Sequence, residues 1–508
     1  MSAKKKAGGD DFVARMTGAY KPGDGYIELG RALHDGEVFS DVVVGLPVAM
    51  CNRHGLIAGA TGTGKTKTLQ LMTEQLSKLG VPVFAADMKG DLSGLSAPGP
   101  ASDAVSERAK ELGVDWQAEA TPTTFLALGG IGNGVPVRAT VSSFGPQLLA
   151  KVLGANETQT SSLSVVFHYA DEKGLGLLDL SDLRAVLQYL TSDDGKAELA
   201  SIGGLAASTG GVLLRSITEL EDQGADAFFG EPQFDVNDLL QVSDGRGIVT
   251  CLELPGVQDR PKLFSTFLLW LLAQLFHELP EVGDTDKPKL VFFFDEAHLL
   301  FEDASKEFLD QVAQTIRLVR SKGVGVFFVT QLPDDVPDDV LAQLGNRVQH
   351  ALRAFTPRDA KALKAAVTTY PKTDDYDLEE DLTQLGIGEA IVTTLSPRGT
   401  PTPVVWTRML PPRSLMGAVD ASQVEASAKA SSLWSSYATA IDRQSAREML
   451  AEKMQVTAPE PGPAPKESHE HKQKKEDGAV VHYLKSQEGR RMMNTVARGV
   501  FGLLKKAR

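Results

Sequence analysis

The feature of this sequence that most constrains its fold is the run Gly59-Ala60-Thr61-Gly62-Thr63-Gly64-Lys65-Thr66, which fits G-x-x-x-x-G-K-[ST] at every fixed position. The apolar residues 55–58 before it predict a strand, and the apolar spacing after it predicts a helix that stops at Gly80. A second strand is expected at 81–86. Because a strand, a Gly-rich loop, a helix and a second strand form a βαβ unit, the chain is predicted to be an α/β protein with a phosphate-binding loop.

The chemistry of this loop suits a nucleotide. Its glycines let the backbone turn N–H groups toward phosphate oxygens, and the helix dipole adds to the attraction. Lys65 is expected to lie against the β- and γ-phosphates of ATP, and the Thr66 hydroxyl to ligate Mg²⁺. The candidate nucleotide-binding residues are Gly59, Ala60, Thr61, Gly62, Thr63, Gly64, Lys65, Thr66 and Lys67. A glycine-rich turn with an incidental lysine is the alternative, and the flanking strand and helix disfavour it.

Two acidic residues follow a second apolar run. The continuous apolar segment 290–294 is typical of a central parallel strand, and it ends in Asp295 and Glu296. Ligands of open α/β sheets lie at the carboxyl ends of the strands. Asp295 is therefore a candidate magnesium ligand, and Glu296 a candidate for polarising the attacking water. Two solvated acids at the end of a strand are the alternative, and His298 fits a packing or hydrogen-bonding role equally well.

A third strand is predicted at 324–329, and Gln331 follows it. This amide is a candidate for sensing the γ-phosphate or orienting the water, with a loop or helix-capping glutamine as the alternative. Arg320, at the end of the preceding helix, lies near the edge of the apolar stripe of that helix. It is a candidate arginine finger toward the phosphate of a neighbouring subunit. An arginine that lays its aliphatic stem along apolar surface fits the periodicity equally well.

The remaining chain is predicted to divide by composition. Apolar helical spacing interrupts the α/β rhythm in the middle of the chain, and a segment rich in Pro, Lys and Glu near the end is typical of a linker. The predicted parts are a disordered start (1–24), the first part of the core with short β segments (25–144), a helical insertion (145–245), the second part of the core (246–410), C-terminal helices (411–456), a disordered linker (457–479) and a basic amphipathic helix (480–508).

Composition limits the class of protein. No apolar run reaches the roughly 18 residues of a membrane-spanning helix, and no secretory signal pattern is present at the start. We therefore expect no integral membrane association. Cys51 and Cys251 are the two cysteines of the chain, so a disulfide framework is excluded and a reducing cytoplasm is expected. The net charge of −14 argues against a broadly basic surface, but a ring can still line its pore with local basic residues.

Several segments together resemble a known family. Residues 52–55 leading into the phosphate-binding loop, 87–91, 295–298 and 330–331 are similar to the motifs of the HerA/FtsK superfamily of P-loop ATPases, including its Walker A and Walker B motifs. The closest resemblance is to the bacterial HerA-like branch typified by YjgR, and it covers roughly residues 25 to 410. The resemblance implies a RecA-like P-loop fold with a parallel central sheet, to which this chain adds the helical insertion and the C-terminal tail.

The resemblance also implies a function. Members of the superfamily are similar to hexameric ring motors that pump double-stranded DNA or move other polymers. In them an arginine before the fourth core strand acts in trans and a glutamine at its end acts as a sensor, which are roles for Arg320 and Gln331 here. ATP and Mg²⁺ are the implied cofactors, and a homo-oligomer, double-stranded DNA or a protein are the implied partners. A motor that remodels a protein without moving DNA, or a scaffold ring locked by ATP, are the alternatives.

The basic helix predicted at 480–508 leaves its role open. Docking on a neighbouring subunit and a solvated basic face are favoured, with contact to nucleic acid next and a membrane surface last.

Overall fold

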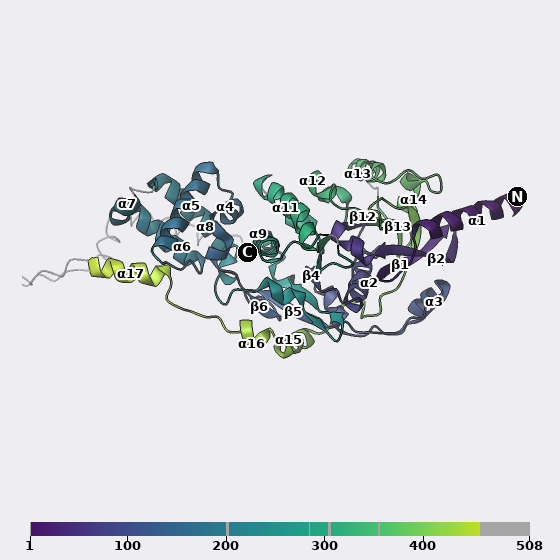
Figure 1. The fold of residues 1–508 in the computed structure, drawn as a ribbon, viewed down its shortest axis with the longest axis horizontal. Coiled ribbons are helices and arrows are strands. Elements are labelled where there is room, and N and C mark those ends of the chain that lie inside the picture. Colours follow the sequence, from purple (N-terminus) through teal and green to yellow (C-terminus); the bar gives the residue numbers. More distant parts are fainter. Residues whose placement is uncertain (1, 200–202, 284, 303–305, 354–355, 458–508) are drawn as a thin grey trace, which may run out of the picture. The chain divides into compact units, whose positions relative to one another are not determined.

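Apolar strands buried on both faces form the centre of the fold. The computed structural model describes residues 2–199, 203–283, 285–302, 306–353 and 356–457. In those ranges twelve strands form one sheet in the order β2-β1-β14-β13-β12-β3-β11-β10-β4-β9-β5-β6. Figure 1 labels β1, β2, β4, β5, β6, β12 and β13 of this sheet. The strands from β12 to β6 are parallel. They are β12 (Asn346–Gln349), β3 (Gly55–Ala58), β11 (Val324–Thr330), β10 (Leu290–Phe294), β4 (Val83–Asp87), β9 (Val249–Glu253), β5 (Thr123–Leu128) and β6 (Val135–Val137).

The other end of the sheet is antiparallel. Its strands are β13 (Glu389–Thr393), β14 (Val405–Met409), β1 (Tyr26–His34) and β2 (Glu37–Pro47). The sequence predicts two short β segments where β1 and β2 lie, and the structure joins them as a hairpin at the edge of the sheet. A separate small hairpin consists of β7 (Val242–Ser243) and β8 (Arg246–Gly247).

Helices cover both faces of the sheet. α2 (Lys65–Lys78) places Leu69, Met72 and Leu76 in one core, together with one set of alternating strand residues. The apolar helices α9 (Pro261–Glu278) and α11 (Lys306–Val319) pack in a second core, against the strand residues that face the opposite side of the sheet. The shorter helices around these cores are α3 (Asp103–Glu111), α10 (His298–Phe301), α12 (Asp338–Leu341), α13 (Pro357–Thr368) and α14 (Leu378–Gln384). Two covered faces explain why the central strands lack a polar side.

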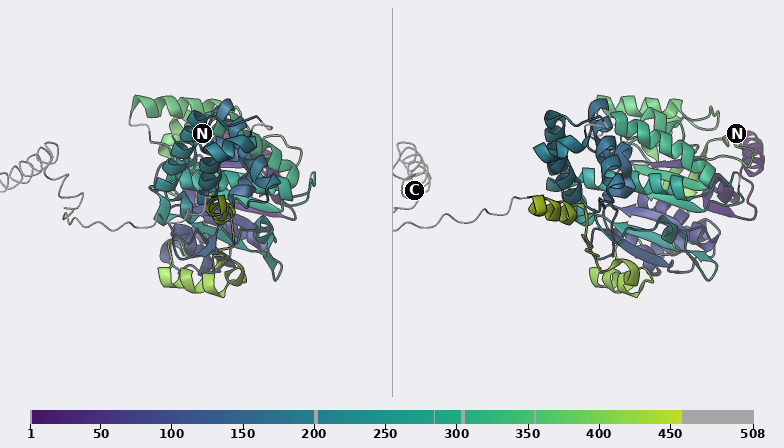
Figure 2. Two further views of the ribbon diagram at one scale, coloured as in Figure 1. Left: turned by 90° about the vertical axis from the view of Figure 1, so that its left-hand side faces the viewer. Right: turned by 60° about the vertical axis from the view of Figure 1, so that its left-hand side comes forward.

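A group of helices interrupts the alternation of strands and helices, in the part of the chain where apolar spacing predicts an insertion. Its members are α4 (Val141–Val152), α5 (Glu157–Glu172), α6 (Leu180–Thr191), α7 (Asp193–Leu199) and α8 (Ala207–Asp222). They share one core with α9, which α4 contacts directly. Figure 2 shows the group as a cluster of blue helices. The Trp270 indole of α9 donates to Ser143 Oγ of α4 at 3.0 Å, which ties this group to the helix that covers the sheet.

Three further helices follow the last strand, namely α15 (Ala421–Ala430), α16 (Trp434–Tyr437) and α17 (Ala446–Thr457). α17 contacts the helical group, since the Arg447 backbone N–H donates to Asp182 Oδ1 at 3.0 Å. The predicted linker and basic helix fall at 457–508, and residues 458–508 lie outside the described part. None of the helices in the described ranges combines the length and apolar character needed to cross a lipid bilayer. Both cysteines are buried and free.

The N-terminal segment corrects one prediction. Where the sequence predicts a disordered start over 1–24, the structure has the helix α1 (Ser2–Ala19). Phe12, Met16 and Tyr20 follow a four-residue spacing that places all three on one face, and all three are buried. The Phe12 ring stacks on His34 of β1 with centroids 4.4 Å apart. The helix is not predicted from the sequence, because the glycines and aspartates at 8–11 lower the apparent helical propensity of the segment.

A buried histidine connects the sheet to the predicted phosphate-binding loop. His350 follows β12, and its backbone N–H donates to Ala58 O at 2.7 Å. Its Nδ1 lies 2.8 Å from Glu389 O, and its Nε2 lies 2.9 Å from Thr68 Oγ1 in α2. A carbonyl can only accept, so Nδ1 carries the proton and Nε2 accepts from the Thr68 hydroxyl. Burial lowers the pKa of His350 to about 4, and the ring is therefore neutral at physiological pH.

Replacing Phe12 with Ala is expected to lower the free energy of unfolding by about 3 kcal/mol, because a buried ring is removed and the site cannot fully collapse. Denaturation in guanidinium chloride measures the change. Thr17→Ala, at an exposed position of the same helix, serves as the control and should leave the midpoint nearly unchanged. Equal midpoints for the two variants would mean that α1 does not pack on the sheet in solution.

The neutral state of His350 predicts a pH dependence of stability. The pKa of this ring is about 4 in the folded chain against an ordinary value of 6.5, so below pH 6.5 the unfolded chain takes up a proton that the folded chain does not. Between pH 8 and pH 5 the wild type should lose about 2 kcal/mol more stability than His350→Gln. Urea denaturation at several pH values tests this. His168→Gln, at an exposed histidine, should follow the wild-type slope, and parallel slopes for all three proteins would contradict a buried neutral ring.

Candidate nucleotide-binding and hydrolysis site

The loop between β3 and α2 (residues 59–64) is shaped by glycines in backbone conformations that other residues rarely adopt. Gly59 has φ +151° and Gly64 has φ +120°. A Cβ atom on Gly59 would lie 2.5 Å from the Cβ of His350, so His350 and Gly59 can pack together only because Gly59 has no side chain. The Gly59 N–H donates to Thr330 O, and the Ala60 N–H donates to Ala351 O at 2.8 Å. These contacts fix the loop against the ends of the neighbouring strands.

Lys65 begins α2 and points back over the loop. Its Nζ donates to Ala60 O at 3.2 Å, and its side chain is 8% exposed. Burial lowers the pKa of Lys65, while the carboxylates of Glu296 and Asp295 act in the opposite direction. The structure therefore brings together the lysine and the two acids that the sequence predicts for one site. A buried ammonium beside a loop of N–H groups is suited to a polyphosphate.

Asp295 lies at the end of β10 with one oxygen unused. Its Oδ1 accepts from the Glu296 N–H at 3.0 Å, and its Oδ2 is buried without a hydrogen-bond partner. Burial, and next the adjacent Glu296, raise the pKa of Asp295 to about 7. A buried carboxylate oxygen without a donor is an expected ligand for a hard cation, and Mg²⁺ is bound in proteins by one or two carboxylates with other oxygens. The half-buried Thr66 can supply the second oxygen, so the residues fit Mg²⁺.

Glu296 has a strained backbone at the edge of the sheet. Its φ is +49°, which is uncommon for a residue with a side chain, and such strain is concentrated at functional sites. Its Oε1 contacts the ammonium of Lys89, and its Oε2 lies 3.3 Å from His298 Nδ1. Burial acts to raise the pKa of Glu296, but Lys89, His298 and Lys65 together bring it below its ordinary value. The carboxylate is therefore charged and able to accept a proton at neutral pH.

Lys89 is a site residue that the sequence patterns do not predict. It follows β4, within the segment 87–91 that carries part of the family resemblance. Asp87 shapes this turn, because its carboxylate accepts from the N–H groups of Gly90 at 2.7 Å and Leu92 at 2.8 Å. The turn then directs Lys89 toward Glu296. Parallel pairing of β4 with β10 brings the two side chains together, and spacing along the chain gives no sign of it.

Asp335 is a second addition to the predicted set. Its Oδ2 accepts from Thr330 Oγ1 at 2.7 Å and from the Leu332 N–H at 2.9 Å, so it orders the turn after β11. Its charge also acts on Lys65. Gln331 lies in this turn. Its backbone oxygen accepts from the Gly59 N–H at 3.2 Å, and its side chain is exposed beside the loop.

Arg320 lies at the amino ends of the parallel strands, on the side of the sheet opposite to the phosphate-binding loop. It begins the 3₁₀ turn Arg320–Lys322, which precedes β11, whereas the phosphate-binding loop follows the carboxyl end of β3. Its charge acts on His54, the residue before β3. Since β11 and β3 are parallel, the length of a strand, roughly 20 Å, separates Arg320 from the loop of the same subunit. The structure does not bring Arg320 together with the other predicted site residues.

The fold is similar to solved structures of a plasmid coupling protein. The bacterial conjugative coupling protein TrwBΔN70 in its unbound form matches with a TM-score of 0.51 and 16% identity, over 79% of this chain and 99% of that one. TrwB in complex with ADP and Mg²⁺ matches with a TM-score of 0.52 and 16% identity, over 78% of this chain and 97% of that one. These likenesses confirm the predicted RecA-like P-loop fold with its central sheet.

Sequence comparison supports a narrower assignment. A probable helicase of Methanocaldococcus jannaschii, MJECL08, is 34% identical over 154 residues. The alignment spans 28% of this chain and 28% of that protein, so it covers little more than a quarter of either. The family described as helicase HerA-like C-terminal matches residues 35–504, which is most of the chain, and it confirms the resemblance that the motifs predict. The chain belongs to the helicase HerA-like C-terminal family.

Proposed function

We propose that this protein is an ATPase that converts ATP hydrolysis into mechanical work. The observation that carries the proposal is the geometry around Glu296, whose charged carboxylate projects from a strained backbone and interacts with Lys65, next to the unused oxygen of Asp295. The loop at 59–66 binds the phosphates, Lys65 attracts the β- and γ-phosphates, and Glu296 accepts the proton of the attacking water. When bound, Mg²⁺ neutralises charge on the phosphates, held through Thr66 and Asp295. Gln331 orients the water or senses the γ-phosphate from the turn after β11.

Arg320 supports an oligomeric arrangement of this ATPase. It cannot reach the phosphates of its own subunit from the far edge of the sheet. In a ring, one edge of a subunit faces the nucleotide of the next, and an arginine there can stabilise charge that develops in the transition state. We therefore propose a homo-oligomeric ring, with six subunits favoured, in which Arg320 acts in trans. The cytoplasm is the proposed location, since both cysteines are free thiols.

Double-stranded DNA is the proposed cargo. Membership of a helicase-like family supports a nucleic-acid polymer over other substrates. The net charge of −14 favours the second candidate, a protein partner remodelled without DNA, because a strongly acidic chain repels phosphate unless basic residues gather locally. DNA binding through local Lys and Arg should weaken with added salt, and this property separates the two cargoes.

Hydrolysis of ATP by the purified protein is expected to rise when long double-stranded DNA is added at low salt, and the stimulation should fall at moderate salt. Lys65→Ala and Glu296→Gln are each expected to reduce turnover at least about 100-fold, because they remove phosphate binding and water activation. Phosphate release measures both. Glu278→Gln changes an exposed carboxyl at the end of α9, away from these residues, and is expected to keep wild-type turnover.

These measurements test the ATPase activity, the cargo and the role of Glu296 separately. Turnover that depends on Lys65 and Glu296 but ignores DNA at every salt concentration would keep the ATPase and favour a protein cargo. Turnover that survives Glu296→Gln would remove the proposed role of that carboxylate.

The contact between Lys89 and Glu296 predicts a shift in the pH profile. The Lys89 ammonium helps to lower the pKa of Glu296, so Lys89→Met should raise that pKa and move the acidic limb of the kcat/KM profile to higher pH. Lys89→Arg keeps a cation and is the matched control, with a limb close to that of the wild type. A profile for Lys89→Met that coincides with the wild type, whatever its absolute rate, would show that Lys89 does not set the charge of Glu296.

A further inference from the structure

A small, largely apolar cavity lies beside the phosphate-binding loop and has no part in the proposed hydrolysis. Its volume is about 280 Å³, at the low end of small-ligand sites and suited to part of a nucleotide. One wall is the loop and the start of α2, at Gly64, Lys67 and Thr68. The facing walls come from α3 and from the segments that flank β13 and β14. The apolar side chains of these walls include Val105, Ile387, Met409, Leu410 and Met416.

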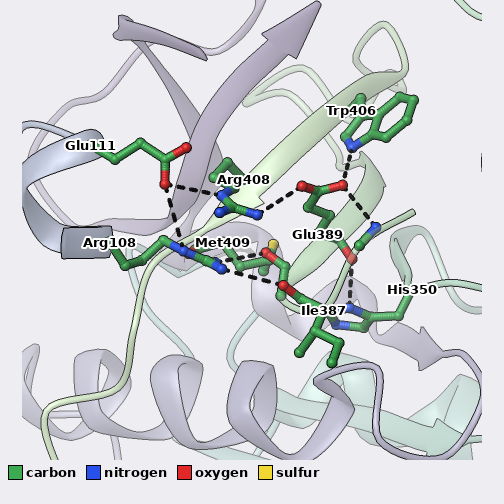
Figure 3. A network of polar contacts seen from close by, with 10 residues as sticks. Arg108, Glu111, His350, Ile387, Glu389, Trp406, Arg408 and Met409 are labelled. Carbon is green, nitrogen blue, oxygen red and sulfur yellow. Dashed lines mark hydrogen bonds and ion pairs between the residues drawn. The ribbon is translucent and has the colours of Figure 1, made fainter. Parts of the chain in front are cut away.

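The walls of the cavity are fixed to each other and to the loop. Arg108 of α3 donates to Ile387 O, Gly388 O and Met409 O at 3.2–3.3 Å (Figure 3). The Gly388 N–H donates to Thr63 O at 3.1 Å, and the Met409 N–H donates to Gly388 O at 2.9 Å. A molecule seated against Ile387 would therefore lie on a wall that is hydrogen-bonded to the phosphate-binding loop.

The polar side chains that line the cavity are already engaged. Lys67 Nζ donates to Gln70 Oε1 at 3.1 Å, and the Thr68 hydroxyl is paired with His350. The Leu410 N–H donates to Leu29 O at 2.8 Å. Pro411 and Pro412, which also line the cavity, have no N–H group to offer. The guanidinium N–H groups of Arg108 already donate to carbonyl oxygens. The flat face of the guanidinium is therefore the part that a planar ligand can contact, and such faces stack on planar rings.

Two apolar side chains of the cavity are left open to solvent. Ile387 is 73% exposed and Met416 is 37% exposed. Ile387 is the most exposed of the large hydrophobic side chains in the described part of the chain. Exposed apolar groups that gather at the mouth of one cavity are an expected feature of a ligand site, whereas single exposed groups are common and carry no such meaning.

We propose that this cavity binds the purine base of the nucleotide whose phosphates occupy the loop at 59–66. The inference rests on the proposed function, since it takes the nucleotide site as given and assigns its base end. The base lies against Ile387 and Met416 and under the face of Arg108. With the polar side chains of the walls engaged, recognition is by apolar contact and stacking. Adenine and guanine should therefore bind with similar affinity, because discrimination between them needs hydrogen bonds to the edge of the ring.

Calorimetric titration with Mg²⁺ and ADP, GDP or pyrophosphate tests the proposal, because pyrophosphate has no base and none of the three is hydrolysed at the site. The wild type should bind ADP and GDP within about threefold of each other and pyrophosphate more weakly. Ile387→Asn should weaken ADP and GDP about 10-fold, through lost apolar contact, and leave pyrophosphate unchanged. Ile441→Asn, at a residue that is 55% exposed and outside the cavity, is the matched control and should match the wild type.

The outcomes separate this inference from the proposed function. If the wild type binds none of the three ligands, or if Lys65→Ala leaves them all unchanged, the nucleotide site itself is wrong. If pyrophosphate binds but Ile387→Asn leaves ADP affinity unchanged, the site stands and the base pocket is overturned. A preference of 100-fold between ADP and GDP would overturn recognition by apolar contact. A changed oligomer size for Ile387→Asn with unchanged ADP affinity would assign the cavity to a neighbouring subunit instead.

Discussion

Parallel pairing of strands that are buried on both faces is the constraint on which the site depends. β3, β11, β10 and β4 are neighbours in the sheet and all run in the same direction. Since both faces of these strands are covered by helices, polar residues are excluded from the strands and gather where the chain leaves them. The phosphate-binding loop, Gln331, Asp295 with Glu296, and Lys89 therefore meet at one edge. Their convergence is a result of topology, although they come from distant parts of the chain.

The charged side chains at this end of the strands differ in whether a nearby opposite charge compensates their burial. Burial raises the pKa of Asp295 and lowers that of Lys65, so each charged form is held at some cost in the free energy of folding. Glu296 is different, because Lys89 compensates its charge. A bound triphosphate would compensate the charge of Lys65, and a bound divalent cation would compensate that of Asp295. Glu296 would remain paired with Lys89. In the proposed site, binding of the phosphates and cation and the ionised base would thus come from different residues.

The sequence predicts the part of this site that depends on local patterns. The loop at 59–66 and the acids after the strand 290–294 follow from short runs of residue types, and the structure places Lys65, Asp295 and Glu296 together. The fold class and the family are also predicted and are confirmed by the comparisons. The roles of Lys89 and His350 cannot be predicted in this way, because they depend on which strands are neighbours in the sheet. The helix α1 is not predicted for another reason. The apolar stripe that Phe12 and Met16 form with the following Tyr20 is short, and it comes after glycines and aspartates that disfavour a helix.

The strand order has a consequence for how the protein is made. β3 comes early in the chain, yet its partners in the sheet are β11 and β12, and β1 pairs with β14. While the ribosome is still synthesising the second half, the strand before the phosphate-binding loop has no neighbour, and His350 has not yet been added beneath Gly59. Contacts so distant in sequence form slowly and leave apolar strand edges exposed in the meantime. The nascent chain thus cannot form the nucleotide site until nearly all of the sheet has emerged, and until then its exposed strands are a natural target for chaperones.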